Sequence, residues 1–90
     1  MRFDVLVEVR LRPGIADPQG STIERSLPTL GFEGISDVQV GKAIRLAVEA
    51  ADADEARRRV DDLCARYLTN PVIEEAVVTL EPAVGAGVTS

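Results

Sequence analysis

The sequence predicts a small α+β domain, in which two helices cover one face of an antiparallel sheet in the order strand, helix, strand, strand, helix, strand. Three observations lead to this class. Apolar residues alternate along residues 2–11, which is the pattern of a half-buried strand. They alternate again on both sides of a two-residue turn at 41–42, and they recur at helical spacing between residues 56 and 67.

The first strand is the most clearly indicated element. Its apolar face comprises Phe3, Val5, Val7, Val9 and Leu11, and charged residues occupy most of the positions between them. This period of two places one face against a core and the other toward solvent.

A helix is expected directly after the loop at residues 12–17. Asp17 can cap it by accepting a backbone N–H, and Pro18 suits the first helical position. Local structure does not explain Gln19 and Gly20, because glycine in a first helical turn costs stability relative to alanine. Close packing of Gly20 against a strand and contact with a partner both remain open.

The first helix should end near Leu27, because Pro28 removes a helical hydrogen bond. Gly31 follows as a C-terminal stop, and Phe32 is expected to fold back onto the core. Residues 35–49 then predict a β-hairpin with its turn at Gly41 and Lys42, and Val38 and Val40 alternate on its first strand. At such a tip, Lys42 would be either an ordinary turn lysine or a contact for a partner's carboxylate or phosphate.

A second helix follows a cap at Asp52 or Asp54, and its apolar positions are Ala56, Val60, Leu63, Cys64 and Tyr67. Cys64 should therefore be a buried, unreactive thiol. The run of arginines at 57–59 is interpreted as a solvated face among acidic neighbours. Asn70 and Pro71 end the helix, and a last strand covers about residues 72–80.

The chain of 90 residues is expected to form a single domain over residues 1–81, followed by a flexible C-terminal tail at 82–90. A core of this size gives only modest stability, which favours oligomerisation.

Composition excludes several classes of function. The net charge of −5 and the presence of only three aromatic residues argue against nucleic-acid binding. The chain has no histidine, so we expect no metal site, and because its single cysteine is expected to be buried we also expect no catalytic residue. No apolar run suits a membrane span and no signal-peptide layout is seen, so a cytoplasmic location is expected.

Four segments give the sequence a family resemblance. They are Asp17-Pro18-Gln19-Gly20, Leu30-Gly31-Phe32, Val40-Gly41-Lys42 and Leu68-Thr69-Asn70-Pro71-Val72-Ile73-Glu74. In this order and spacing they resemble the PurS subunit family of bacterial phosphoribosylformylglycinamidine synthase, over roughly residues 3–80. The sequence departs from the family pattern at Pro28, Thr69 and Ala76.

The resemblance implies a non-catalytic subunit of an ATP-dependent ligase of purine biosynthesis, which converts formylglycinamide ribonucleotide and glutamine to formylglycinamidine ribonucleotide. In that family the synthase subunit PurL holds ATP and magnesium, and the glutaminase subunit PurQ releases ammonia. A PurS-like homodimer or homotetramer would bridge the two. The resemblance therefore implies no cofactor on this chain.

Several residues that local structure leaves unexplained lie at the ends of the predicted elements, where loops are presented for recognition, and we expect them to contact the synthase or glutaminase subunit. With Asp17 included, the expected partner-binding residues are Asp17, Gln19, Gly20, Lys42, Asn70 and Glu74.

Two alternatives share the same element order. A small-molecule regulatory module of the ACT type is favoured by the segment Arg12-Pro13-Gly14-Ile15, which resembles its ligand loop, and amino-acid binding would distinguish it. An RNA-binding sheet is less well supported, because it needs aromatic residues on the strands and a basic surface.

Overall fold

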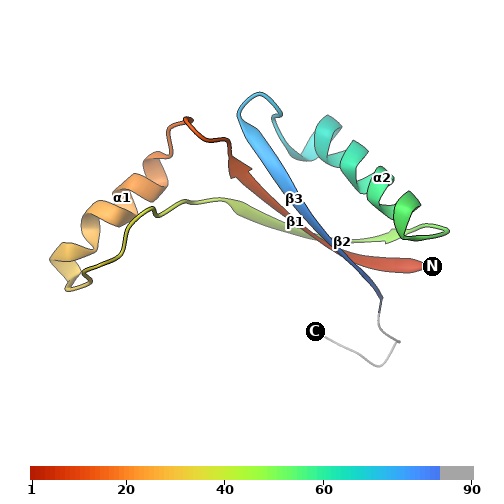
Figure 1. Cartoon of the computed structure of the whole chain (residues 1–90), viewed down its shortest axis with the longest axis horizontal. Helices are drawn as coiled ribbons and strands as arrows, with labels where there is room; N and C mark the ends of the chain where they lie inside the picture. The colour runs from red at the N-terminus through yellow and green to blue at the C-terminus, as the bar shows by residue number, and fades with distance from the viewer. Residues whose placement is uncertain (84–90) are drawn as a thin grey trace.

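A computed structural model describes residues 1–83 of the chain. A three-stranded antiparallel sheet has the order β2-β1-β3, with α2 packed on one face and α1 set apart from it (Figure 1). The elements are β1 (Arg2–Leu11), α1 (Pro18–Ser26), a 3₁₀ turn η1 (Pro28–Leu30), β2 (Lys42–Glu49), α2 (Ala53–Leu63), a π-helical turn η2 (Cys64–Leu68) and β3 (Glu74–Pro82). The predicted α+β class, with an antiparallel sheet and two helices, is confirmed.

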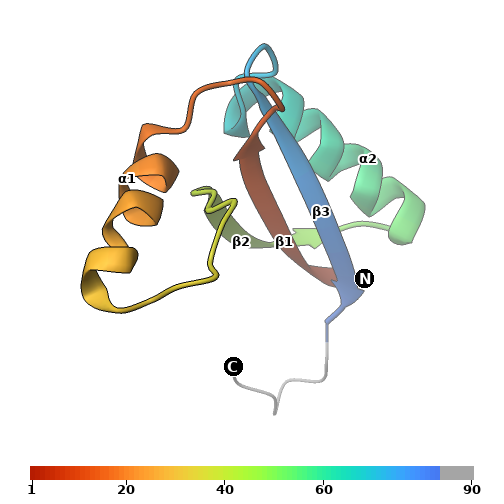
Figure 2. The same ribbon diagram turned by 60° about the vertical axis from the view of Figure 1, so that its left-hand side comes forward.

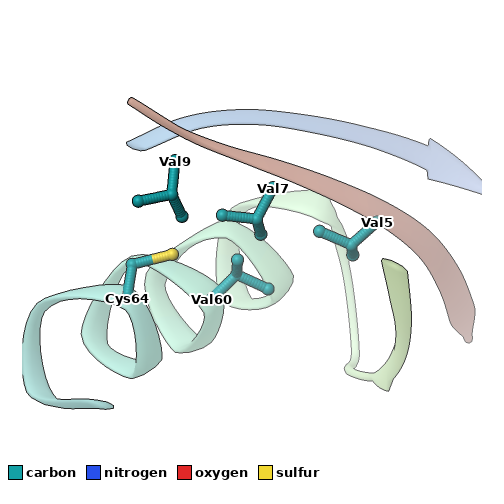
Figure 3. Close-up of a cluster of buried hydrophobic side chains, with 5 residues drawn as sticks. All are labelled: Val5, Val7, Val9, Val60 and Cys64. Atoms are coloured by element: carbon teal, nitrogen blue, oxygen red, sulfur yellow. The ribbon is translucent and has the colours of Figure 1, made fainter. Parts of the chain in front are cut away.

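The core lies between α2 and one face of the sheet, which we call the inner face. From β1, Val5, Val7 and Val9 point toward Val60 and Cys64 on the helix (Figure 3). Apolar side chains from β2 and β3 pack around this cluster. The alternation predicted for β1 is therefore correct, and Cys64 is buried as expected.

The hydrogen-bond ladder determines which peptide groups of the edge strands face outward. Met1 and Ala50 exchange two backbone hydrogen bonds, of 2.8 and 2.9 Å. Because bonded pairs alternate in an antiparallel ladder, even-numbered residues of β2 face β1 and odd-numbered residues face outward. On β3, the bonds from Arg12 N–H to the Ile73 carbonyl and from Ala83 N–H to the Arg2 carbonyl give the opposite parity, with even-numbered residues outward.

The predicted hairpin at residues 35–49 is wrong. Residues 35–41 form no strand in the sheet, and Lys42 is the first residue of β2 rather than the tip of a turn. The alternation at Val38 and Val40 did indicate extended backbone, but this backbone continues β2 instead of pairing with it. Gly41 passes so close to β1 that a Cβ atom would stand 2.6 Å from the Val9 carbonyl oxygen.

The position of α1 also differs from the expectation that both helices cover one face. It lies beyond the end of β1, beside the segment that precedes β2 (Figures 1 and 2). The helix ends before Leu27, and Gly31 adopts a positive φ of 90° as the expected stop. Phe32, expected to fold back onto the core, is 54% exposed.

The second helix begins where the sequence predicts, because the Asp52 carboxylate accepts the Glu55 N–H at 2.8 Å. Its last turn widens at Cys64–Leu68, which leaves Tyr67 81% exposed rather than on the buried stripe. The last strand reaches Pro82, and the Ala83 N–H donates to the Arg2 carbonyl at 2.9 Å, so these two residues of the predicted tail belong to the sheet. Residues 84–90 of the predicted tail lie outside the described residues. Within the described part of the chain, no helix is long and apolar enough to cross a membrane.

Candidate functional site

A groove of about 410 Å³ at the end of β1 brings together four of the six residues expected to bind a partner. They are Asp17, Gln19, Lys42 and Glu74. The groove lies between the start of α1, the segment entering β2 and the start of β3. We call it the β1-end groove; its remaining lining residues are Val9, Arg10, Leu11, Pro18, Val40 and Gly41.

Asp17 has both carboxylate oxygens engaged within the chain. Oδ1 accepts the Gly20 N–H at 2.9 Å, as a helix cap does, and Oδ2 accepts the Val40 N–H at 2.9 Å. These backbone hydrogen bonds, that of Gly20 first and that of Val40 second, lower the pKa of Asp17 from its ordinary value of 3.8, because they favour the ionised form. Asp17 therefore anchors one wall of the groove.

Glu24, which was not among the residues predicted from the sequence, anchors the same segment two residues earlier, at Val38. Its Oε1 accepts the Val38 N–H at 2.9 Å. Val38 and Val40 are even-numbered, and along β2 the even-numbered residues direct their peptide groups toward β1. Beyond the end of β1, the carboxylates of Asp17 and Glu24 therefore accept the hydrogen bonds that a neighbouring strand would accept. The spacing of seven residues between Asp17 and Glu24, which is two helical turns on one face, was a signal that could have indicated this.

Gly20 is buried because the segment entering β2 approaches it closely. A side chain here would collide with the Val38 carbonyl and would stand 2.5 Å from Asp17 Oδ2. Of the two explanations left open for Gly20, close backbone packing thus has direct structural support. Gln19 is exposed beside it and also lines a shallow apolar hollow with Thr22, Ile23 and Val40.

Lys42 is exposed on the inner face at the start of β2, opposite Val9. It is not at a hairpin tip, but its side chain still lines the β1-end groove. No hydrogen bond or ion pair of its ammonium group is found within residues 1–83.

The turn before β3 holds Asn70 and Glu74 against each other. The Glu74 carboxylate accepts the Asn70 N–H at 2.7 Å, and the Asn70 side chain accepts the Val72 N–H at 3.2 Å. Arg12 joins this turn to the first loop, because its Nε donates to the Pro71 carbonyl at 2.9 Å. These three hydrogen bonds hold the turn in place, and Val72 within it is 79% exposed.

A second groove, of about 560 Å³, opens on the outer face of the same region. Its charged residues balance: Arg10, Arg12 and Lys42 oppose Glu8, Asp17 and Glu75. Arg10 and Glu75 are paired at 3.4 Å. The segment suggested as an ACT-type ligand loop, residues 12–15, lines this groove, but the balanced charges give it no preference for an anion.

The chemistry available in the β1-end groove is recognition rather than bond making. It offers one amide, two cationic groups and two carboxylates, and the one cysteine lies buried between the end of α2 and the sheet. Burial, and secondarily the charge of Asp61, raise the pKa of the Cys64 thiol. Among residues 1–83, no group of three or more histidine, cysteine, aspartate or glutamate side chains is placed to hold a metal ion.

The family model and the relatives that match this chain belong to the same family. Residues 4–82 match the family model described as PurS, phosphoribosylformylglycinamidine (FGAM) synthase. The chain is 40% identical over 81 residues to the synthase subunit PurS of Synechocystis sp., which covers 87% of this chain and 81% of that protein. It is 35% identical over 85 residues to the PurS subunit of Methanothermobacter thermautotrophicus, covering 94% of this chain and all of that protein.

Solved structures of PurS chains also resemble the fold of this chain closely. A chain in the structure of PurLQS from Thermotoga maritima superposes with a TM-score of 0.83 at 35% identity, covering 89% of this chain and 98% of that chain. PurS of Thermus thermophilus superposes with a TM-score of 0.81 at 30% identity, covering 93% and 100%. The separate placement of α1 is thus compatible with close similarity to experimental structures.

Proposed function

The chain belongs to the PurS family of phosphoribosylformylglycinamidine synthase subunits, and from this premise we propose that it joins the glutaminase subunit PurQ to the synthase subunit PurL. The observation that carries the proposal is the similarity, along nearly the whole chain, to a chain in the structure of PurLQS. The complex would act in purine biosynthesis, in the cytoplasm.

The subunit would contribute to catalysis by position alone. Ammonia released from glutamine reacts efficiently only if the acceptor lies close to its source, because a held geometry avoids the entropic cost of bringing reactants together. ATP and magnesium would bind to the synthase subunit, where the acceptor is activated. A binding role for this chain, with the chemistry on its partners, agrees with a groove lined by amide and charged side chains.

The β1-end groove is the proposed contact surface for a partner subunit. Gln19 and Lys42 are exposed polar groups that line it, whereas Asp17 and Gly20 would support it by holding the segment that enters β2. Asn70 and Glu74 would support it from the other side by fixing the turn before β3.

The subunit is further proposed to be a homodimer or homotetramer. Its radius of gyration is 16.9 Å, compared with about 12 Å for a compact chain of this length. The excess arises because α1 and the adjoining segment lie away from the sheet, with large apolar residues such as Leu30, Phe32 and Ile35 exposed. An extended unit with exposed apolar side chains gains stability when another chain covers it.

Reconstitution tests the joining role directly. The chain is mixed with PurL and PurQ from the same source, with ATP, magnesium and glutamine present, and is separated by size-exclusion chromatography. We expect one complex that contains all three chains, and a PurL–PurQ association that weakens when this chain is left out. Equal association of PurL and PurQ in its presence and absence would contradict the proposal.

A further inference from the structure

The end of β1 leaves one residue without its partner strand. In the ladder between β1 and β2, odd-numbered residues of β1 form the bonded pairs, and the last of these pairs joins Val9 to Lys42. The next bonded pair in this register would join Leu11 to Val40, but the Val40 N–H donates to Asp17 Oδ2 instead. As a result, the N–H and the carbonyl of Leu11 have no hydrogen-bond partner within residues 1–83.

These two peptide groups lie at the β1-end groove. Arg12, the next residue, donates its N–H to the Ile73 carbonyl on the β3 side, so the peptide groups of Leu11 point the opposite way, toward Val40. Leu11 and Val40 both line the groove and both are half-buried. The space in which the two residues would have paired therefore offers one donor and one acceptor to a ligand.

A primary carboxamide matches this pair of groups. Its carbonyl oxygen can accept the Leu11 N–H while its NH₂ group donates to the Leu11 carbonyl, as the backbone of an opposite strand does. A carboxylate has no hydrogen to donate, and an ammonium group has no acceptor. The free peptide groups of Leu11 therefore favour an amide over a charged group.

The charged side chains of the groove favour a zwitterion. Of the four that line it, Asp17 has both oxygens engaged with backbone N–H groups, and Arg10 is held in an ion pair with a residue of β3. Lys42 forms no ion pair in the described part of the chain, and Glu74 uses one carboxylate oxygen to accept a backbone N–H. The charges available to a ligand are thus one ammonium group and one carboxylate, which complement the α-carboxylate and α-ammonium groups of a free amino acid.

Lys42 and Glu74 flank the free peptide groups on the inner face. Glu74 lies directly opposite Leu11 on β3, whereas Lys42 lies on β2 opposite Val9. Val9 is two residues, or about 7 Å, back along β1 from Leu11. A ligand whose amide pairs with Leu11 must therefore carry its α-groups on a spacer of several bonds, which favours glutamine over the shorter asparagine.

We propose that the β1-end groove binds free L-glutamine, with its carboxamide paired to the peptide groups of Leu11, its α-carboxylate at Lys42 and its α-ammonium group at Glu74. The choice of glutamine also rests on the proposed function, in which the complex consumes this amino acid. Gln19 is left exposed beside the ligand for contact with a partner subunit. Residues 13–15, which belong to the segment compared above with an ACT-type ligand loop, line the second groove and not this one.

Asp17 would be a positioning residue for this site. It touches no part of the ligand in this arrangement, because both of its oxygens accept backbone N–H groups. By holding the Val40 N–H, it keeps Val40 from pairing with Leu11 and closing the space that the carboxamide enters.

Titration of the isotope-labelled full chain with L-glutamine tests the site. In NMR spectra we expect the amide resonance of Leu11 to shift and to saturate as glutamine is added. L-glutamate is the matched probe, because it has the same length and the same α-groups but cannot donate to the Leu11 carbonyl. It should bind at least about tenfold more weakly, since a site that hydrogen-bonds an NH group rejects an analogue without it. A Leu11 amide that does not respond to glutamine, or equal binding of glutamate, would overturn the proposal.

A pair of variants tests the charge assignment. Lys42→Ala should raise the dissociation constant for glutamine by about tenfold, because a hydrogen bond between charged groups is lost. Arg45→Ala removes a cation from the same strand but from the outer face, so it is the matched control and should bind glutamine like the wild type. Wild-type affinity in Lys42→Ala would overturn the placement of the ligand in this groove.

The titration uses the chain without PurL or PurQ, so its outcome is independent of the joining role. A chain that joins PurL to PurQ but gives no response to glutamine would overturn this site and leave the proposed function standing. A chain that binds glutamine at Leu11 but does not join the two subunits would support the site and contradict the proposed function.

Discussion

Gly20 of α1 lies directly against the backbone of Val38, and any side chain at position 20 would collide with the Val38 carbonyl. The contact exists because Asp17 and Glu24 draw the segment entering β2 onto the helix. A glycine that is unfavourable for an isolated helix is therefore required by the packing of two segments that are distant in the sequence.

Replacement of this glycine should disrupt the contact. Gly20→Ala is expected to cost about 1–3 kcal/mol, the usual effect of forcing extra atoms into a packed site. Hydrogen exchange at the Val38 and Val40 amides should accelerate, because both amides depend on the contact for their carboxylate partners. Ser21→Ala, at an exposed neighbouring position, serves as the control. Wild-type exchange in Gly20→Ala would contradict the model of close packing.

The anchoring of Val40 should depend on pH through Asp17. Because the pKa of Asp17 is lowered in the folded chain, its ionised form contributes stability above its ordinary value of 3.8. That contribution is lost as the pH falls through the lower folded-state value. The amide resonance of Val40 should therefore titrate below pH 3.8 in NMR spectra of the wild type. In Asp17→Asn this titration should be absent, and its persistence would assign the effect to another group.

The core beneath α2 should be sensitive to small losses of volume. Val7 is 0% exposed and packs against the helix, so Val7→Ala should lower the free energy of unfolding by about 2 kcal/mol, from lost burial and the remaining cavity. Val72→Ala makes the same chemical change at an exposed turn and should stay within about 0.5 kcal/mol of the wild type. Urea denaturation of the two variants measures the difference, and equal midpoints would argue against this core.

Substitutions in the β1-end groove should weaken assembly without unfolding the chain. Gln19→Ala and Lys42→Ala remove exposed groups, and Glu74→Gln keeps an acceptor for the Asn70 N–H while it removes the charge. Loss of a polar partner in an interface costs about 2 kcal/mol or more, which weakens binding at least tenfold. Titration into PurL and PurQ measures this loss.

The nitrogen source then separates assembly from chemistry. Glutamine-dependent turnover should fall in these variants, whereas turnover with high free ammonia should fall less, because external ammonia does not need the bridge. Arg58→Ala, an exposed charge on α2 remote from the groove, is the matched control. Groove variants that assemble and turn over like Arg58→Ala would leave these residues with a structural role only.

The thiol of Cys64 should be unreactive in the folded protein. Burial raises its pKa, with a further increase from the neighbouring charge of Asp61, so little thiolate forms at neutral pH. A thiol reagent such as DTNB should label the native protein slowly and the urea-unfolded protein quickly. Rapid labelling of the native state would show that η2 opens readily above the core.

Local sequence determined the elements whose partners lie close along the chain. The alternation in residues 2–11 specified β1 and its inner face, because the period of a strand directly sets which side chains share a face. Asp17-Pro18 specified the start of α1, and the start of α2 was predicted to within two residues, at Asp52 or Asp54, because a cap needs only residues one turn away. The four family segments identified the PurS family without any structure.

Tertiary structure alone decided which neighbour each extended segment takes. Val38 and Val40 have the alternation of a strand, but whether such a segment pairs with β2 or continues it depends on hydrogen-bond partners elsewhere in the chain, and here those partners are the carboxylates of Asp17 and Glu24. The burial of Phe32 likewise could not be predicted, because an apolar side chain does not by itself indicate whether it reaches the core. Gln19, Lys42 and Glu74 likewise come from three separate elements, and only the placement of α1 beyond the end of β1 brings them to one groove.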